Sequence, residues 1–210
     1  MRIFTLFLLV LLPLQGWAQG AATLVADSVR LNGQDQLIAN GNVEVLFDGS
    51  RLTATEILYD RASDTLQVTG PIFIRSNDGT ILTAESATLD PRLENGILQG
   101  ARIVLDQQLQ LVAAQIDQQQ GRYSQLYKTS ATSCRVCGTG PPLWEIRAER
   151  VIRDAQERQL YFENATFRVR GVPILWLPRM RLPDPTLSRA TGLLIPVQRN
   201  TTQLGAGCLL

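Results

Sequence analysis

The residues best suited to chemistry are two of the three cysteines, which are spaced as Cys134-x-x-Cys137. Such a pair could form half of a zinc site, a thioredoxin-like redox pair or a structural disulfide. Zinc needs four ligands, and the chain has no second cysteine pair and no histidine to complete the set. A redox pair belongs at the start of a helix, whereas this pair lies among predicted strands and loops. We therefore predict no metal and favour a structural disulfide.

A group of acidic residues in the second half of the chain offers the other possible chemistry, because paired carboxylates can act as general acid and base. These residues are Glu145, Glu149, Asp154, Glu157 and Glu163, with Arg147, Arg150, Arg153 and Arg158 interleaved among them. Such mixed charges are typical of a solvated outer face, and a chain without histidine lacks the commonest general base. We predict that no residue is catalytic, that no cofactor is needed and that the protein is not an enzyme.

The first residues predict export. Arg2 precedes an apolar run from Ile3 to Leu14, and the small-residue pattern Gly16-Trp17-Ala18 follows, so residues 1–18 are predicted to be a cleaved signal peptide. No later stretch is apolar for long enough to be a transmembrane helix. With 20 basic and 19 acidic residues the net charge is +1, so no overall field attracts nucleic acid.

A repeat runs through the rest of the chain. Its units begin at Ala26, Ala54, Ala84, Ala114 and Ala148, at spacings of 28, 30, 30 and 34 residues. A second recurring feature of the unit opens its other half at Gly41, Gly70, Gly100 and Asn164, at offsets of 15, 16, 16 and 16 residues. Both halves alternate apolar with polar residues between turn formers such as Asn32-Gly33, which is the pattern of strands.

About two strands in each of five units give roughly ten antiparallel strands, enough for an all-β roll with an apolar interior. In the fourth unit the segment from Asp117 to Cys134 is polar, so we expect a loop to interrupt the roll there. The prolines at 173, 178, 183, 185 and 196 argue against a central strand, so residues 171–190 are predicted to be an extended connector. Trp144 and Trp176 are expected to be core or interface plugs at the wide end of the roll rather than ligand contacts.

The units, with Ala-(Asp/Glu) opening one strand and Gly-x-(Val/Ile)-x-(Val/Ile) the next, resemble the OstA-like repeat of the lipopolysaccharide transport proteins over about residues 22–170. The second half of the chain is similar to the LptD branch of that family, at the junction of its roll and its barrel. The matching segments are Thr132 to Cys137, Pro141 to Ala148, Phe162 to Ala165, Gly171 to Pro178, Pro183 to Pro185 and Thr191 to Pro196.

The resemblance implies an open β-jellyroll at 22–170, followed at 171–210 by a connector and the start of an outer-membrane barrel. Because the family continues for several hundred residues, we expect a fragment, a truncated product or a frameshifted terminus near Cys208. The implied disulfide joins Cys134 and Cys137 to cysteines near the far end of the barrel. Without those partners the pair could close on itself, stay reduced or pair with Cys208.

The implied function is transfer of lipopolysaccharide at the periplasmic face of the outer membrane, in a trough that shields the acyl chains. Strand alternation predicts the residues that line this trough: Val43, Val45, Phe47, Leu66, Val68, Ile72, Ile74, Ile103, Leu105, Phe167 and Val169. The implied partners are the bridge protein LptA, paired with the edge strand around Leu24 to Leu31, and the lipoprotein LptE through the barrel. The segment from Gly171 to Pro196 is expected to point lipid toward the barrel.

Three alternatives remain from the sequence. The first is a soluble carrier like LptA, which should bind lipid without a barrel. The second is an exported disulfide oxidoreductase, which should lose turnover of a dithiol substrate on Cys134→Ser. The third is a structural β-solenoid, which should bind neither lipid nor partner.

Overall fold

The computed structural model describes residues 22–33, 35–106, 108–134 and 141–186, and two short strands beyond them. Every regular element in these ranges is a strand. The strands are β1 (Thr23–Val25), β2 (Ser28–Asn32), β3 (Gln36–Phe47), β4 (Ser50–Asp60), β5 (Thr65–Arg75), β6 (Ile81–Leu89), β7 (Gly96–Leu105), β8 (Leu109–Gln119), β9 (Tyr123–Thr132), β10 (Trp144–Asp154), β11 (Gln159–Val169), β12 (Val172–Pro183), β13 (Val197–Thr201) and β14 (Gly205–Leu209). The described residues contain no helix long and apolar enough to cross a membrane.

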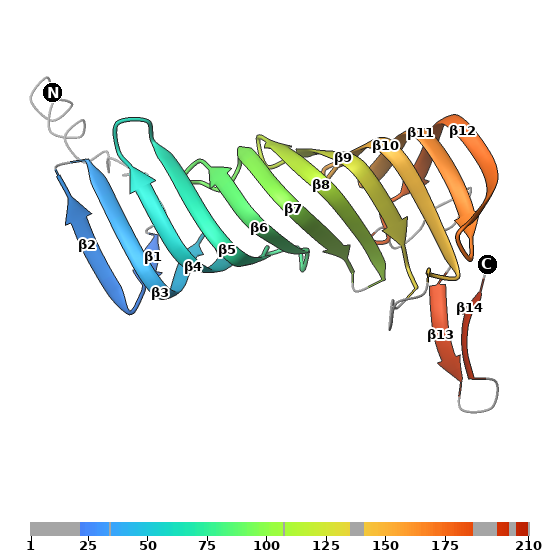
Figure 1. Cartoon of the computed structure of the whole chain (residues 1–210), viewed down its shortest axis with the longest axis horizontal. Coiled ribbons are helices and arrows are strands. Elements are labelled where there is room, and N and C mark those ends of the chain that lie inside the picture. The colour runs from blue at the N-terminus through green and yellow to red at the C-terminus, as the bar shows by residue number, and fades with distance from the viewer. Residues whose placement is uncertain are drawn as a thin grey trace, which may run out of the picture.

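The first twelve strands form one antiparallel sheet in which each long strand pairs with the next along the chain. β1 and β2 both pair with β3, on either side of Ala26 and Asp27, so together they act as one interrupted strand. Figure 1 shows the strands following one another along the long axis, from β2 at one end to β12 at the other. The path ends at β12 without returning to β1, so the sheet is open. β13 pairs only with β14.

The ladder is interrupted near the middle of every long strand, along a line that we call the crease. Between β3 and β4, for example, the pairing passes from Asn40 and Glu56 directly to Val43 and Ala54. The crease comprises residues 41–42, 54–55, 70–71, 84–85, 100, 113–114, 128–129, 148–149 and 164. Several of them have a positive φ, which fits the bulges that bend strands: Gly41, Asn42, Gly100, Lys128 and Asn164.

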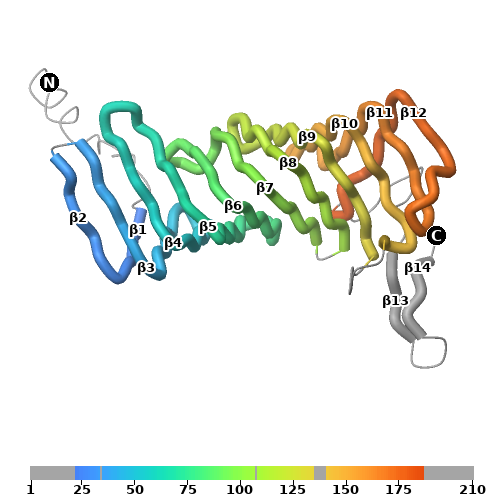
Figure 2. Tube along the Cα trace, viewed as in Figure 1, coloured from blue at the N-terminus to red at the C-terminus, as the bar shows by residue number. Residues whose placement is uncertain are grey.

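The crease divides the sheet into two halves whose inner faces pack against each other. A flat single sheet would leave both faces open to water, yet residues on one face of both halves are fully buried, such as Ile57 and Leu52 on either side of the crease of β4. Small buried residues lie on the crease or directly beside it, where the halves meet: Ala54, Ala84, Ala101, Ala113, Ala148 and Ala165. In the Cα trace of Figure 2 the strands are bent, and each strand lies further along the long axis than the one before it.

The structure confirms an all-β, open antiparallel roll, with twelve strands in place of about ten because the first is divided in two and β12 is added at the end. The predicted connector is wrong for residues 172–183, which form β12 and carry the roll past residue 170. Prolines are compatible with this strand because it lies at the edge, where one side needs no hydrogen bonds. The predicted signal peptide, the cysteine at 137 and the end of the expected connector lie outside the described residues.

The predicted loop in the fourth unit is also wrong up to Thr132, because this segment forms the end of β8 and all of β9. Its polar residues mislead because they alternate with buried ones: Ile116 and Leu126 are completely buried. The roll is therefore uninterrupted across the fourth unit as far as residue 132.

Candidate functional site

The structure places the predicted trough residues on the inner side of the roll or at its rim. Six are buried, namely Val43, Val68, Ile72, Ile74, Ile103 and Leu105. Five are half-buried, namely Val45, Phe47, Leu66, Phe167 and Val169. Val45, Leu66 and Phe167 pack against the buried core, and Val169 pairs with Trp144. This placement agrees with the predicted register, but lipid binding by these residues stays a prediction.

The middle of the interior is filled by side chains. The largest side chains that are fully buried are Leu52, Ile57, Ile72, Leu89, Leu98, Ile103, Leu105, Leu109, Leu111, Ile116, Leu126 and Phe162. They come from both halves of the sheet and form one hydrophobic cluster. An acyl chain that enters this region has to separate the two halves and replace side-chain contacts with lipid contacts.

The turns of the roll form two rows, because antiparallel strands turn alternately at opposite ends. The first row joins β4 to β5, β6 to β7, β8 to β9 and β10 to β11, and residue 184 follows β12 on the same row. The second row joins β3 to β4, β5 to β6, β7 to β8, β9 to β10 and β11 to β12. Folding at the crease brings the rows face to face. We call the line between them the seam.

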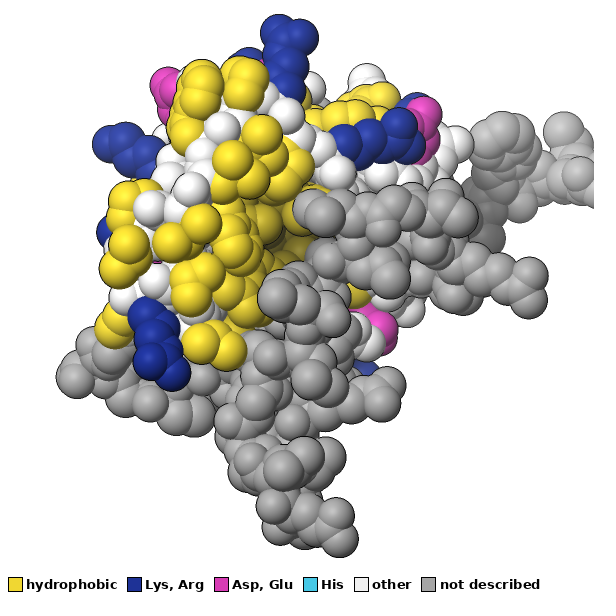
Figure 3. Space-filling view, turned by 90° about the vertical axis from the view of Figure 1, so that its right-hand side faces the viewer, with side chains coloured by type: hydrophobic (Ala, Val, Ile, Leu, Met, Phe, Trp, Pro, Cys, Tyr) yellow, Lys and Arg dark blue, Asp and Glu magenta, His cyan; other side chains and the backbone are white. Residues whose placement is uncertain are grey.

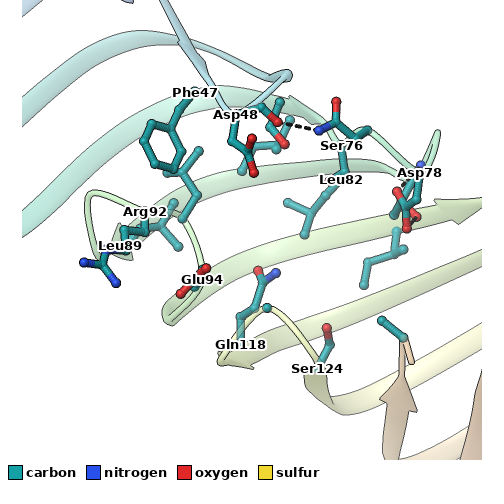
Figure 4. Close-up of a pocket in the computed structure, with 18 of the residues that line it drawn as sticks. Phe47, Asp48, Ser76, Asp78, Leu82, Leu89, Arg92, Glu94, Gln118 and Ser124 are labelled. Atoms are coloured by element: carbon teal, nitrogen blue, oxygen red, sulfur yellow. Dashed lines mark hydrogen bonds between the residues drawn. The ribbon is translucent and has the colours of Figure 1, made fainter. Parts of the chain in front are cut away.

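A cavity of about 340 Å³ lies at the seam, which is near the lower end of the usual range for ligand sites, about 300 to 1,000 Å³. Its apolar lining includes Phe47, Ile74, Leu82, Leu89 and Ile103. Its polar lining comes from both rows and includes Asp48, Asp78, Arg92, Glu94, Gln118 and Arg153. Figure 4 shows the second-row residues Asp48 and Asp78 on one side of the cavity and Glu94, Gln118 and Ser124 on the other. Three predicted trough residues, Phe47, Ile74 and Ile103, therefore line an actual opening.

Arg153 lies at the end of β10 with its side chain inside the roll, only 9% exposed. Its Nε atom donates to Asp184 Oδ2 at 3.1 Å, and the Asp184 side chain is completely buried. Its Nη2 atom reaches across the seam to Thr80 Oγ1 at 3.3 Å and Asp78 Oδ2 at 3.5 Å. The sequence analysis placed Arg153 among outer charges and missed this role. Strand alternation could have found it, because Arg153 shares the inward face of the buried Val151.

Asp78 is held in its ionised form. Partial burial raises its pKa, but hydrogen bonds from the Thr80 backbone N–H and hydroxyl and the nearby Arg153 guanidinium outweigh that effect, so the pKa lies below its usual value. The bond from Arg153 to Asp78 is therefore an ion pair at neutral pH, with the Asp78 side chain 51% exposed.

Asp154 joins two neighbouring turns of the first row. Arg122 donates to it from Nε and Nη2, at distances between 2.7 and 3.2 Å. These hydrogen bonds outweigh the effect of burial and, with the backbone N–H groups of Glu157 and Gln156, lower the pKa of Asp154 to about 2. This carboxylate therefore stabilises the turn.

The predicted outer position is right for Glu149 and Glu157, which are exposed, but wrong for Glu145 and Asp154, which are buried. Glu145 is paired with Arg147 Nε at 3.0 Å and accepts a hydrogen bond from Ser130. Arginines and hydroxyls thus surround the buried acids. The described residues include no group of three or more His, Cys, Asp or Glu side chains placed to hold a metal ion.

Cys134 is buried and disulfide-bonded. Neither of the other cysteines is among the residues whose side chains are described, so the predicted pairing with Cys137 stays a prediction. The Cys134 backbone N–H donates to the Thr132 hydroxyl, which donates in turn to the Trp144 carbonyl. Trp144 is itself buried and stacks on Phe167 with ring centroids 6.3 Å apart, as expected of a residue that fills one end of the roll.

Exposed apolar residues gather at both ends of the open sheet. At the first edge they are Leu24, Val25, Val29 and Leu31, and at the last edge they are Val172, Ile174, Leu175 and Trp176. Trp176 is 59% exposed, so it is not a core residue of the described roll, and its role as an interface plug stays a prediction. Figure 3 shows hydrophobic side chains over much of the described end face near β12. Unpaired strands with apolar side chains are suited to pairing with another chain.

No known family profile matches the chain. The chain is 25% identical over 191 residues to the LPS-assembly protein LptD of Nitrosococcus oceani, which covers 90% of this chain and 25% of that protein. It is 28% identical over 176 residues to LptD of Neisseria meningitidis serogroup B, covering 82% and 21% respectively. For LptD of Salmonella typhimurium the identity is 28% over 191 residues, covering 86% and 24%. The chain thus spans a quarter or less of the length of these relatives.

Among solved structures, the crystal structure of LptH from Pseudomonas aeruginosa, described as the LptA homologous periplasmic component of the lipopolysaccharide transport device, overlaps this chain weakly. The identity is 12% and the TM-score 0.27, covering 64% of this chain and 76% of that one. A TM-score this low supports no argument. The matches in sequence extend over most of the chain, and it is therefore a homologue of the LPS-assembly proteins LptD, as its repeat and motifs predicted.

Proposed function

We propose that this chain is a periplasmic conduit for lipopolysaccharide that shields the acyl chains inside its roll and passes the lipid on for outer-membrane assembly. One observation carries the proposal: the apolar residues that alternation selects lie inside or at the rim of an unclosed roll, in a homologue of LptD. The soluble-carrier alternative is not favoured, because these relatives are LptD proteins.

The physical basis is the cost of exposing acyl chains to water. Each CH₂ group moved out of water gains about 0.8 kcal/mol, so a chain of several such groups needs an apolar path. The interior is lined mainly by Leu, Ile, Val and Ala, which offer contact area without anchoring the lipid by hydrogen bonds. An open sheet provides this path while the sugar part stays in water.

Photocrosslinking in cells tests this proposal with the full-length protein. A photoreactive residue replaces the inward Val45 or Ile72, with the outward, exposed Leu46 or Phe73 as matched controls on the same two strands. Adducts with lipopolysaccharide only from positions 45 and 72 support the conduit. If folded variants give no adduct from any position, or equal adducts from all four, the proposal fails.

The proposed partner at the first edge is a bridge protein of the LptA type, which adds its strand beside β1 and β2. The exposed Val29, on the unpaired side of the sheet, supports this docking. The ladder bonds alternate from the bond of the Asp27 N–H to the Gly41 carbonyl, so the N–H of the exposed Arg30 faces the unpaired side of β2. Arg30→Pro removes this N–H and should abolish co-purification of the bridge protein, whereas Arg30→Ala should keep it. Equal co-purification of both variants contradicts edge pairing. Contact with LptE through a barrel stays a prediction.

A further inference from the structure

Among the described residues, one side chain makes the polar bonds that cross the seam between the two rows of turns. Between described residues, the hydrogen bonds and ion pairs that cross the seam are those from Arg153 of the first row to Asp78 and Thr80 of the second. Asp78 and Arg153 are 75 residues apart in sequence, whereas the backbone ladder joins only neighbouring strands. We call these three residues the clasp.

The two sides of the clasp differ in strength. On its own row, Arg153 is bound at 3.1 Å to Asp184, whose side chain is completely buried. Across the seam it is bound at 3.5 Å to Asp78, whose side chain is 51% exposed. A buried charge left unpaired is costly, but an exposed ion pair breaks easily because water replaces it. Arg153 can therefore release Asp78 while Asp184 still neutralises its charge.

The clasp also borders the seam cavity. Asp78, Thr80 and Arg153 all line it, together with the apolar Leu82 and Ile103. The interior beyond is filled by packed side chains, so an acyl chain can enter sideways only if the two rows move apart. Releasing Asp78 removes the polar bonds that oppose this movement and breaks no bond of the ladder.

We propose that the clasp of Arg153 with Asp78 and Thr80 is a latch that controls lateral opening of the roll to the acyl chains of lipopolysaccharide. This inference rests on the proposed function and adds the place where the seam opens. It predicts that weakening the clasp speeds entry of lipid while the sheet stays intact.

The test variant is Asp78→Asn, which loses the charge but keeps an oxygen to accept the Thr80 backbone N–H. The matched control is Asp48→Asn, because Asp48 lines the same cavity and is exposed but has no side-chain bond across the seam. Arg153 is left in place because its removal would leave the buried Asp184 carboxylate without its ion-pair partner. Thr80→Val, combined with Asp78→Asn, removes the hydroxyl acceptor of the clasp as well as its negative charge.

The first readout needs no lipid. Spin labels introduced as unnatural amino acids at the exposed Asn77 and Gln156 report the width of the seam in the full chain. The distance distribution should widen with Asp78→Asn, widen further with the double variant and stay unchanged with Asp48→Asn. An unchanged distribution in both clasp variants overturns the latch, whatever the lipid does.

The second readout is the rate at which purified lipopolysaccharide enters, followed by photocrosslinking from position 72. Asp78→Asn should raise this rate about two- to fivefold, the range expected for loss of an exposed ion pair, and raised salt should speed entry in the native protein but not in the variant. Equal rates in the native protein and both variants overturn the latch. A seam that widens in a protein that takes up no lipid overturns the proposed function, and the lipid role of the latch with it.

Discussion

The closest backbone approach at the crease gives the sharpest test of the fold. A Cβ atom added at Gly70 lies 2.3 Å from the carbonyl oxygen of Glu85 and 3.0 Å from that of Ala84. Ordinary contact begins near 3.4 Å, so Gly70→Ala has to push the backbone of β6 away by about 1 Å. No side chain can rotate to relieve this contact.

Gly70→Ala should therefore cost about 3 kcal/mol of unfolding free energy, from overpacking and weakened ladder bonds between β5 and β6. The matched control is Gly79→Ala, where nothing lies within 4 Å of the added atom. Gly79 has a φ of +80°, so alanine there should cost only about 1 kcal/mol, from backbone strain.

Urea unfolding followed by far-ultraviolet circular dichroism measures both changes, and amide hydrogen exchange shows whether β5 and β6 lose protection. Equal costs for the two variants would refute the idea that the crease requires close backbone contact at Gly70. A cost below about 1 kcal/mol for Gly70→Ala would do the same, because Gly70 has no positive φ and crowding against β6 is the cost that the variant measures.

Other substitutions test the core, the first row of turns and the end of the roll. Leu111→Ala should cost about 2 to 5 kcal/mol because Leu111 is completely buried, whereas Val112→Ala, at an exposed neighbour, should cost under about 1 kcal/mol in the same urea titration. Because the pKa of Asp154 is lowered to about 2 from 3.8, its stabilisation is complete above about pH 4 and is lost as the pH falls toward 2. Asp154→Asn should lower the unfolding free energy at pH 7 by about 1 kcal/mol, given the partial exposure of Arg122, and should flatten the acid-side fall; a curve parallel to the native one contradicts this. Phe167→Leu should disturb the packing of Trp144 and shift its fluorescence, and an unchanged spectrum would contradict their stacking.

The sequence predicted the inner face of the roll well, because apolar residues alternate with polar ones on both sides of each crease position. The repeat of Ala and Gly also has a physical cause that the sequence analysis did not identify. Ala54 and Ala84 are small because the two halves meet there, and Gly70 leaves room for the backbone of the next strand. The repeated Ala and Gly residues thus mark positions where strands bend as well as positions where strands begin.

The connector prediction failed because a local rule was applied without its sheet context. Proline at 173 and 178 excludes a central strand but permits an edge strand, and an edge is defined only by the complete order of strands. The contact of Arg153 with Asp78 could not be predicted from the sequence, because the two residues belong to different repeats. No local pattern indicates which turns face each other across the seam.

The order of the strands has a consequence for how this protein comes apart. From β3 to β12 each strand pairs along the array only with its neighbours in sequence, and β1 and β2 pair only with β3, so the sheet behaves as a linear array in which one end can melt while the other stays folded. Of the described tryptophans, Trp144 is in β10 and Trp176 in β12, so their fluorescence follows only the last quarter of the array. A native-looking emission spectrum is therefore compatible with a frayed first edge. A variant in β2 to β5 has to be judged by a probe that measures strand content along the whole chain.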